Sequence, residues 1–294
     1  MDETNRRWVP REELDTLCGE RLEGTVLDGL HVAGSLDGLV APAVAVVGTR
    51  IPSDGGRRLA RRLGEALGNA GVCVVSGLAL GIDGAAHEGA LAAGAPTIGV
   101  LGGGHDHFFP SRHRELAGRI VTHGGAVVSP YAPHEPARPH QFLARNGVVA
   151  ALVDAVVVVE AAQRSGALNT ASWAADRSIP VFAFPGDVDR PKVAGCLALI
   201  RDGAILVRDA QDVLDGLPTL PRQPRTVRRR IPAGRAGDPP AIAAVLAALA
   251  DGERDPEMLA ATLDLAPGLL LPALIELEVG GRIERRSGGF ALAE

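Results

Sequence analysis

Short apolar runs recur along the first two thirds of this chain, and each is followed by a segment with helical periodicity. Some runs, such as 155–159, are apolar at every position, as in strands that helices cover on both faces. Regular alternation of strands and helices predicts an α/β fold built on a doubly wound, mostly parallel sheet. The expected strands are 44–47, 72–75, 96–101, 125–129, 155–160, 181–184 and 205–207.

Helical periodicity is clearest in 56–69, where Leu59, Leu63 and Leu67 repeat every four residues on one face. Residues 6–23 are compatible with a helix, and 31–34 with a short edge strand. A loop rich in proline and histidine is expected at 130–140. The other expected helices are 84–93, 112–122, 142–152, 169–176 and 196–202.

The composition divides the chain into an N-terminal extension (1–42), an α/β domain (43–217), a linker (218–240) and a small C-terminal domain (241–294). The linker carries five prolines after Pro218 and six arginines, with no hydrophobic period. This composition is typical of a stiffened, solvated tether. A basic arm that touches a nucleic-acid backbone is the alternative.

The C-terminal segment predicts a winged helix. Expected helices at 241–249, 256–262 and 267–279 precede a hairpin formed by 282–285 and 289–293. The segment 269–278, which would be the recognition helix, is apolar and acidic, so it is poorly suited to reading a major groove. A protein-contact role fits it at least as well.

Charge and cysteine content exclude several classes of protein. The formal net charge of -5 means that any nucleic-acid surface must be local. Cys18, Cys73 and Cys196 are too far apart for a disulfide framework or a zinc motif, and no metal or cofactor is expected. Neither a signal-like leader nor a membrane-length apolar run is found, so we expect a cytoplasmic protein with no membrane contact.

Glycines and hydrogen-bonding side chains follow neighbouring strands. Gly48, Thr49 and Arg50 come directly after the first core strand, and Ser76 and Gly77 end the next. Backbone N–H groups in such turns attract anions, and an arginine fork suits a phosphate. The pattern predicts a nucleotide or nucleic-acid pocket at the carboxyl edge of the sheet.

Further polar residues support this edge. Ser165 and Gly166 precede a helix and form a second candidate anion cradle. Asp83 is interpreted as a helix N-cap, and His87 as hydrogen-bonded structure rather than a catalytic base. Glu160 ends the most apolar strand and is expected to accept backbone hydrogen bonds.

Eight motifs in register carry a resemblance to a known family. They are Gly48–Arg50, Ser76–Asp83 with His87, Thr97–Gly104, Phe109–Pro110, Arg145–Asn146, Val159–Glu160, Ser165–Ala171, and Pro185–Gly186 with Gly195–Cys196. The series resembles the DNA-processing protein A family (DprA, also called Smf) over about residues 25–210. The segment from Ala241 is similar to that family's winged-helix domain. The family's helical N-terminal domain is expected to be absent or shrunk into residues 1–24.

The resemblance implies a modified Rossmann fold that binds single-stranded DNA and passes it to the RecA recombinase in natural transformation or recombination. It also implies a homodimer without enzymatic activity. Phe142 is similar to the family aromatic against which a base stacks. Carried over by motif, Asp83, His87 and Glu160 shape the pocket. The implied DNA contacts are Gly48, Thr49, Arg50, Ser53, Ser76, Gly77, Gly81, Phe142, Arg145, Asn146, Arg164, Ser165, Gly166, Thr170 and Gly186.

The chain departs from the family pattern at several positions. Leu80 and Gly147 stand where the family commonly has arginine, and Pro130 where it commonly has glutamate. Val193 and Leu197 replace a serine and an asparagine. Losing two cations removes about two phosphate contacts, so we expect a divergent member with weaker or altered DNA affinity.

Two other functions stay open from the sequence: a nucleotide sensor and a protein-interaction adaptor. Phosphoribohydrolases with a similar sheet carry a catalytic glutamate where Trp173 stands here, so hydrolysis is disfavoured. A hydride-transfer enzyme is excluded, because the glycines 102–104 lack the spacing and the acidic ribose ligand of a dinucleotide site.

Overall fold

The computed structural model describes residues 6–217, 239–249, 255–263, 267–286 and 289–292. The chain forms two compact units, Met1–Gln223 and Pro224–Glu294. The predicted linker, except for its last two residues, lies outside the described residues, and so does the basic arm proposed for it.

The first unit is built on one nine-stranded sheet in the order β1-β2-β6-β5-β4-β3-β7-β8-β9. Neighbouring strands from β6 to β9 run parallel, whereas β1 pairs antiparallel with β2 and β2 antiparallel with β6. The strands are β1 (Arg6–Pro10), β2 (Gly29–Gly34), β3 (Ala43–Val47), β4 (Cys73–Ser76), β5 (Thr97–Val100), β6 (Ala126–Ser129), β7 (Ala155–Val158), β8 (Val181–Ala183) and β9 (Ile205–Leu206).

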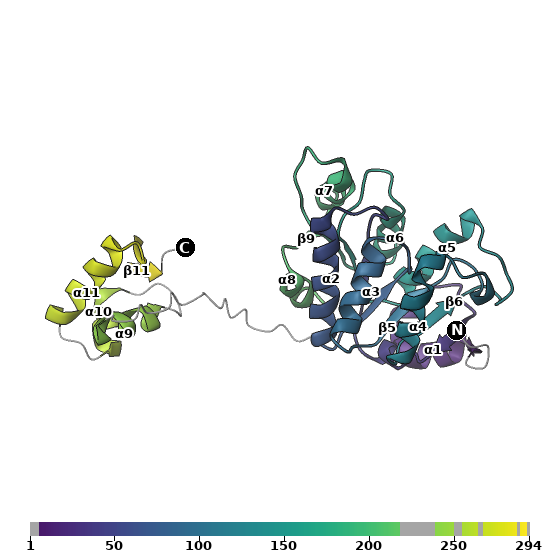
Figure 1. The fold of residues 1–294 in the computed structure, drawn as a ribbon, viewed down its shortest axis with the longest axis horizontal. Helices are drawn as coiled ribbons and strands as arrows, with labels where there is room; N and C mark the ends of the chain where they lie inside the picture. Colours follow the sequence, from purple (N-terminus) through teal and green to yellow (C-terminus); the bar gives the residue numbers. More distant parts are fainter. Residues whose placement is uncertain (1–5, 218–238, 250–254, 264–266, 287–288, 293–294) are drawn as a thin grey trace. The chain divides into compact units, whose positions relative to one another are not determined.

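Helices cover both faces of this sheet, which confirms the predicted doubly wound α/β fold. One face carries α2 (Asp54–Asn69), α3 (Ile82–Ala92), α4 (Arg114–Thr122) and α8 (Ala210–Asp215), and Figure 1 shows α2, α3 and α4 side by side. The other face carries α1 (Arg11–Cys18), α5 (Pro139–Ala151), α6 (Gly166–Ala175) and α7 (Ala194–Arg201).

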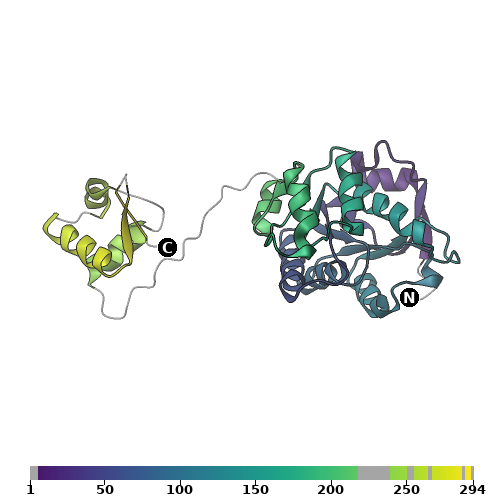
Figure 2. The same cartoon turned by 90° about the horizontal axis from the view of Figure 1, so that it is seen from above.

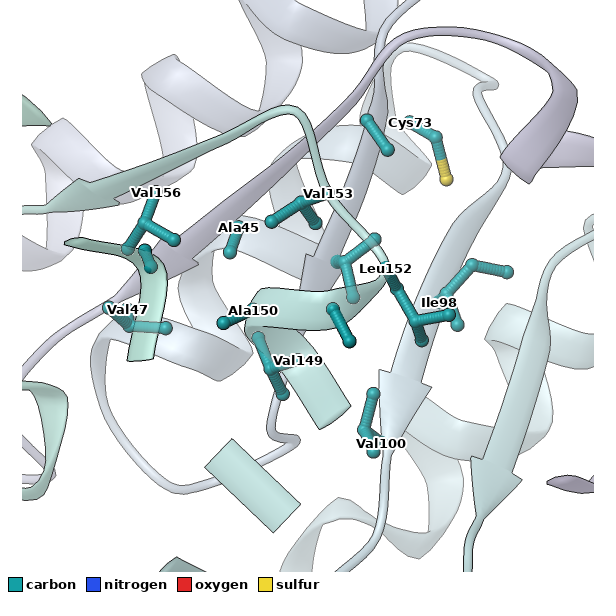
Figure 3. Close-up of a cluster of buried hydrophobic side chains, with 14 of the residues drawn as sticks. Ala45, Val47, Cys73, Ile98, Val100, Val149, Ala150, Leu152, Val153 and Val156 are labelled. Atoms are coloured by element: carbon teal, nitrogen blue, oxygen red, sulfur yellow. The ribbon is translucent and has the colours of Figure 1, made fainter. Parts of the chain in front are cut away.

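The core on the second face lies between α5 and the central strands. Val149 and Ala150 of α5 pack close to Ala45 and Val47 of β3 and to Val156 of β7 (Figure 3). These side chains are almost fully buried, and burying one valine stabilises the fold by about 1.5–3 kcal/mol. This packing holds the start of α5 above the carboxyl ends of the strands.

Glycines bring α2 and α3 into close contact. A Cβ at Gly64 would collide with the carbonyl oxygen of Ala86, and a Cβ at Gly89 with that of Arg61. The two helices therefore approach nearly backbone to backbone, and a larger residue at either glycine would force them apart. The pair forms one rigid layer beside the turn that follows β4.

The N-terminal segment differs from the prediction. Residues 6–10 form β1 instead of the start of a helix, and the helix is confined to Arg11–Cys18. Strand 31–34 is not an edge strand, because β1 pairs with it and forms the edge, in purple in Figure 2. Val9, Leu14 and Leu30 are fully buried in the same core as the central strands. Helix α8 was not predicted.

The second unit is a winged helix, as predicted. It contains α9 (Pro240–Leu249), α10 (Pro256–Leu263) and α11 (Pro267–Val279), and an antiparallel hairpin of β10 (Ile283–Arg286) and β11 (Gly289–Leu292). Val245, Leu249 and Leu274 are buried in its separate core. Across the described parts of both units, no helix is long and apolar enough to cross a membrane.

Candidate nucleic-acid interface

A cleft of about 330 Å³ opens at the carboxyl ends of β3, β4 and β7. The chain leaves β3 toward β4 on one side and later returns to β7 on the other, so this is the switch point where ligands bind in such sheets. Of the residues predicted for the site, the cleft is lined by Gly48, Thr49, Arg50, Gly77, Asp83, Phe142, Arg145, Asn146, Arg164, Ser165, Gly166 and Thr170.

Two cations of the cleft are exposed. Arg50 follows β3, and Arg164 lies in the loop between β7 and α6. Neither belongs to any ion pair found in the part of the chain that the structure describes. Their guanidinium groups are therefore available to an anion, and each matches the geometry of a phosphate.

An aromatic side chain of the cleft lies beside Arg50 and Arg145. The Phe142 ring is half-buried, and its centre is 5.9 Å from the guanidinium carbon of Arg50 and 6.0 Å from that of Arg145. Phe109 contacts it edge-on at 5.8 Å and is itself 54% exposed. Phe142 thus presents an aromatic face at the cleft between positive groups, which suits a stacked base.

Arg145 is buried, which differs from its predicted role as a direct DNA contact. Its Nη1 donates to the carbonyl oxygens of Gly77 and Val100, and its Nε donates to Asn146 Oδ1 at 3.3 Å. Burial lowers the pKa of Arg145 to about 10, and the nearby charge of Asp83 opposes that shift. Arg145 therefore holds the β4 and β5 ends in place, and its guanidinium group lies against the Phe142 ring.

Asp83 is not the N-cap of α3, because the helix begins at Ile82 and Gly81 is its cap. The Asp83 carboxylate turns back and accepts hydrogen bonds from the backbone N–H groups of Gly77, at 3.0 Å, and Ala79, at 3.4 Å. Burial raises the pKa of Asp83, and the Arg145 charge opposes this.

The N–H of Gly77, which was predicted to help cradle a phosphate, donates to Asp83 instead. A glycine is needed there for another reason: a Cβ would lie 2.7 Å from the guanidinium carbon of Arg145. The N–H of Thr49 is also engaged, since it donates to the carbonyl oxygen of Glu160 at 2.6 Å. Close packing accounts for the glycines of these two turns.

The N-terminus of α2 is closed by a carboxylate of the protein. Glu160 is buried and accepts hydrogen bonds from the Ser53 backbone N–H, at 2.8 Å, and from the Ser53 hydroxyl. Ser53 in turn caps the helix by accepting from the Gly56 N–H at 3.0 Å. A Cβ at Gly56 would collide with the Glu160 carboxyl group. An external anion therefore has no place at the start of α2.

The N-terminus of α6, by contrast, opens on the cleft. Ser165 caps it, accepting a hydrogen bond from Ala167 N–H at 3.3 Å, and Ser165, Gly166 and Ala167 all line the cleft. Asn146 Nδ2 donates to the Gly166 carbonyl and to Asn169 Oδ1, each at 3.2 Å, which fixes α6 against α5. Helix N-termini attract anions, so α6 is the helix that can receive a phosphate here.

Four predicted contact residues lie outside the cleft. Ser53 is engaged by Glu160, and Ser76 is fully buried with its hydroxyl donating to the Val46 carbonyl at 2.7 Å. Gly81 has a φ of +90° and packs on the backbone of Arg50. Gly186 is exposed in the loop after β8 and does not line the cleft.

His87 is a buried structural residue. The Thr97 hydroxyl donates its proton to the Val74 carbonyl, so it must accept from His87 Nδ1, which lies at 2.8 Å. Nε2 is buried and has no hydrogen-bond partner among the described residues. Burial lowers the pKa of His87 to about 3, so the ring stays neutral.

Apolar residues of the cleft escaped the sequence analysis. Ile51 and Leu143 line it while being 75% and 54% exposed, and Phe109 borders the adjoining surface. The available signal was proximity in sequence, since Ile51 follows Arg50 and Leu143 follows Phe142. Exposed apolar side chains next to cations suit a ligand with both aromatic bases and phosphates.

Residues 27–218 match the family described as DNA recombination-mediator protein A, and residues 232–289 match the DprA winged helix domain. The chain belongs to this DprA family. It is 41% identical over 270 residues to the putative DNA processing protein DprA of Mycobacterium tuberculosis, covering 87% of this chain and 66% of that protein. It is 42% identical over 199 residues to protein Smf of Escherichia coli, covering 66% and 53%.

Solved structures support the same assignment. DprA from Streptococcus pneumoniae has a TM-score of 0.66 and 38% identity, covering 72% of this chain and 74% of that one. DNA processing protein A from Helicobacter pylori, described for its single-stranded DNA binding mode, has a TM-score of 0.61 and 26% identity, covering 71% and 93%. The match therefore spans about two thirds of the length of the Mycobacterium tuberculosis protein and about half of the length of the Escherichia coli protein.

Proposed function

We propose that this chain binds single-stranded DNA in the cleft between β3 and β7 and delivers it to the RecA recombinase. The observation that carries the proposal is the grouping of Arg50 and Arg164, both exposed and outside any described ion pair, around Phe142 at the open end of α6. Membership of the DprA family and likeness to the Helicobacter pylori protein support it.

The chemistry of the cleft favours a single strand over a duplex. Arg50, Arg164 and the N–H groups at the start of α6 bind backbone phosphates. Phe142 offers a stacking surface, which only an unpaired base can reach. A duplex presents its phosphates but keeps its base faces inside the stack, so it would lose the aromatic part of the interaction.

The proposal contains no catalytic step. The carboxylate inside the cleft, Asp83, is engaged by two backbone N–H groups and is held there as structure. Trp173 stands where related hydrolases carry a catalytic glutamate, and its ring packs against Gly147, at which a Cβ would lie 3.3 Å away. The indole therefore covers a position where family members commonly carry arginine. Delivery to RecA and homodimer formation rest on family membership alone.

Equilibrium binding to a labelled oligothymidine and to a matching duplex, across a salt series, tests the proposal. We expect tighter binding to the single strand, with log affinity falling by about 0.7 per phosphate contact for each unit of log salt concentration. Equal or tighter binding to the duplex would contradict the cleft assignment. Absence of binding at low salt would favour the nucleotide sensor or the protein adaptor, and titration with mononucleotides would separate those two.

A further inference from the structure

A second hollow, of about 280 Å³, lies beside the end of the β4–α3 turn, at Gly81. It is bounded by α2, by α3 and by the residues around the start of α4. Arg57 and Arg61 line it from α2, Gly81 and Gly84 from α3 and its cap, and His113 from the segment before α4. Nothing in the function proposed above uses this hollow.

Residues adjacent in sequence and in space connect the cleft with this hollow. A small depression of about 60 Å³ contains Arg50 and Phe142, which border the cleft, together with Leu80 and Phe109. The next residue after Leu80, Gly81, already lines the hollow. A Cβ at Gly81 would lie 2.7 Å from the carbonyl carbon of Arg50, so the backbone that borders the hollow packs directly on the turn that carries Arg50.

The charge of the hollow is positive and is not neutralised by neighbours. Arg57, Arg58, Arg61 and Arg62 are all exposed on α2, and none takes part in an ion pair among the residues the structure describes. The acidic residue of the hollow, Glu88, pairs with Arg119 at 3.3 Å instead.

The helical repeat divides these four arginines into two rows. Arg57 and Arg61 are four residues apart and face the hollow, whereas Arg58 and Arg62 form the neighbouring row and do not line it. The close contact of α2 with α3 through Gly64 and Gly89 fixes the first row relative to the cleft. The backbone that carries Arg57 and Arg61 is therefore held in a fixed position beside the hollow.

We propose that a strand bound in the cleft continues past Phe109 and Leu80 into this hollow, where Arg57 and Arg61 bind its backbone phosphates. The inference rests on the proposed function, because the same strand must first occupy the cleft. A basic groove beside an aromatic platform is the usual arrangement for tracking a single strand. Helix α2 thus supplies positive charge next to Leu80, where an arginine of the family is missing.

Oligothymidines of two lengths, about 4 and about 16 nucleotides, test this continuation, since these lengths bracket the usual site size of one binding module. In the Arg57→Ala/Arg61→Ala variant we expect affinity for the long strand to fall at least about fivefold and its salt slope to fall by about 1.4. Affinity for the short strand should stay within about twofold, because the short strand fills only the cleft.

The Arg58→Ala/Arg62→Ala variant is the matched control, since it removes the same charge from the same helix without altering the hollow. It should lose less than half as much affinity, on a logarithmic scale, for the long strand. Arg57→Lys/Arg61→Lys should restore most of the binding, and thermal melting would check that every variant is folded.

Equal losses in the two alanine variants would overturn the inference, because they would indicate a general effect of charge. So would an equal loss for short and long strands, which would place both arginines at the cleft itself. If the unmodified protein binds neither oligothymidine, the proposed function fails and the inference fails with it. If it binds both, and Arg57→Ala/Arg61→Ala changes nothing, only the continuation is wrong.

Discussion

The cleft of the first unit and helix α11 of the second unit present opposite chemistry to a nucleic acid. At the cleft of the first unit, Arg50 and Arg164 are exposed beside Phe142. In the second unit, α11 contains two glutamates and neither lysine nor arginine, and it exposes Ile275 and Glu276. A winged helix is often taken as the DNA-binding part of a protein, but here its α11 carries no cation, whereas the cleft of the α/β unit combines exposed cations with an aromatic ring.

The comparison shows that a fold does not determine its role, because function depends on the side chains placed on it. The apolar and acidic surface of α11 suits contact with another protein better than contact with phosphates. Measurements that separate the two units can therefore support or contradict the proposal that DNA binds to the first unit.

The largest expected loss of single-strand affinity comes from replacing the arginines of the cleft. Arg50→Ala should weaken single-strand binding by at least about 1 kcal/mol, and Arg50→Ala/Arg164→Ala by about 2 kcal/mol, because each removes a charge-assisted hydrogen bond. Fluorescence anisotropy with labelled oligothymidine measures both. Arg7→Ala, at the far edge of the sheet, is the control. Unchanged affinity in the double variant would show that DNA binds elsewhere.

The second prediction concerns acid stability, which should differ between the units. The pKa of His87 is about 3 in the folded protein and 6.5 ordinarily, so the unfolded chain takes up a proton that the folded one does not. Stability is therefore lost as the pH falls below 6.5, by about 1 kcal/mol between pH 7 and 5.5. Burial lowers the pKa of His105 as well, which adds to the loss.

Urea unfolding followed by tryptophan fluorescence measures this loss in the first unit alone, because the chain has 2 tryptophans, Trp8 and Trp173, and both belong to it. His87→Gln should reduce stability at pH 7 but also flatten the pH dependence. A slope that is the same in His87→Gln as in the unmodified protein would mean that other groups cause it.

Restoring a cation beside the cleft should raise DNA affinity by a smaller factor than the cleft arginines lower it when they are replaced. Leu80 is half-buried. It lines the small depression that also contains Phe109 and Arg50. Leu80→Arg should tighten oligothymidine binding about two- to threefold at low salt and steepen the salt dependence, since it adds about one phosphate contact. Leu80→Gln, polar but uncharged, should not; equal gains in both would exclude an electrostatic cause.

The smallest effect is expected from removing the winged helix. Deletion of residues 239–294 should leave single-strand affinity within about twofold, because the cleft and its cations belong to the Met1–Gln223 unit. The same anisotropy titration measures it. A loss larger than that of Arg50→Ala would move the DNA surface to the second unit.

Most of the α/β framework was predictable because β3 to β7, its central strands, are buried on both faces. Residues 6–10 could not be recognised as a strand, since β1 is stabilised by pairing with β2 more than twenty residues away. The short α8 was missed for a similar reason: packing on α2 through Val213 holds it in place.

The location of the site was predictable, but the roles of its residues were only partly so. Arg50, Arg164 and Phe142 follow motifs and lie in the cleft. The turn at Gly77 looked like a phosphate cradle because local sequence shows glycines and not their hydrogen-bond partners. The carboxylate of Asp83 occupies that turn only because helix α3 folds back over it, and the burial of Arg145 likewise follows from tertiary packing.

The hydrogen bonds between Glu160 and Ser53 also bear on competition among ligands. In dinucleotide-binding enzymes of similar topology, the pyrophosphate lies on the N-terminus of the first helix of the sheet. Here the corresponding helix is α2, and the Glu160 carboxyl group already lies there, hydrogen-bonded to Ser53. A nucleotide phosphate would therefore find this position filled by a side chain of the protein, and the open helix N-terminus at the cleft is that of α6.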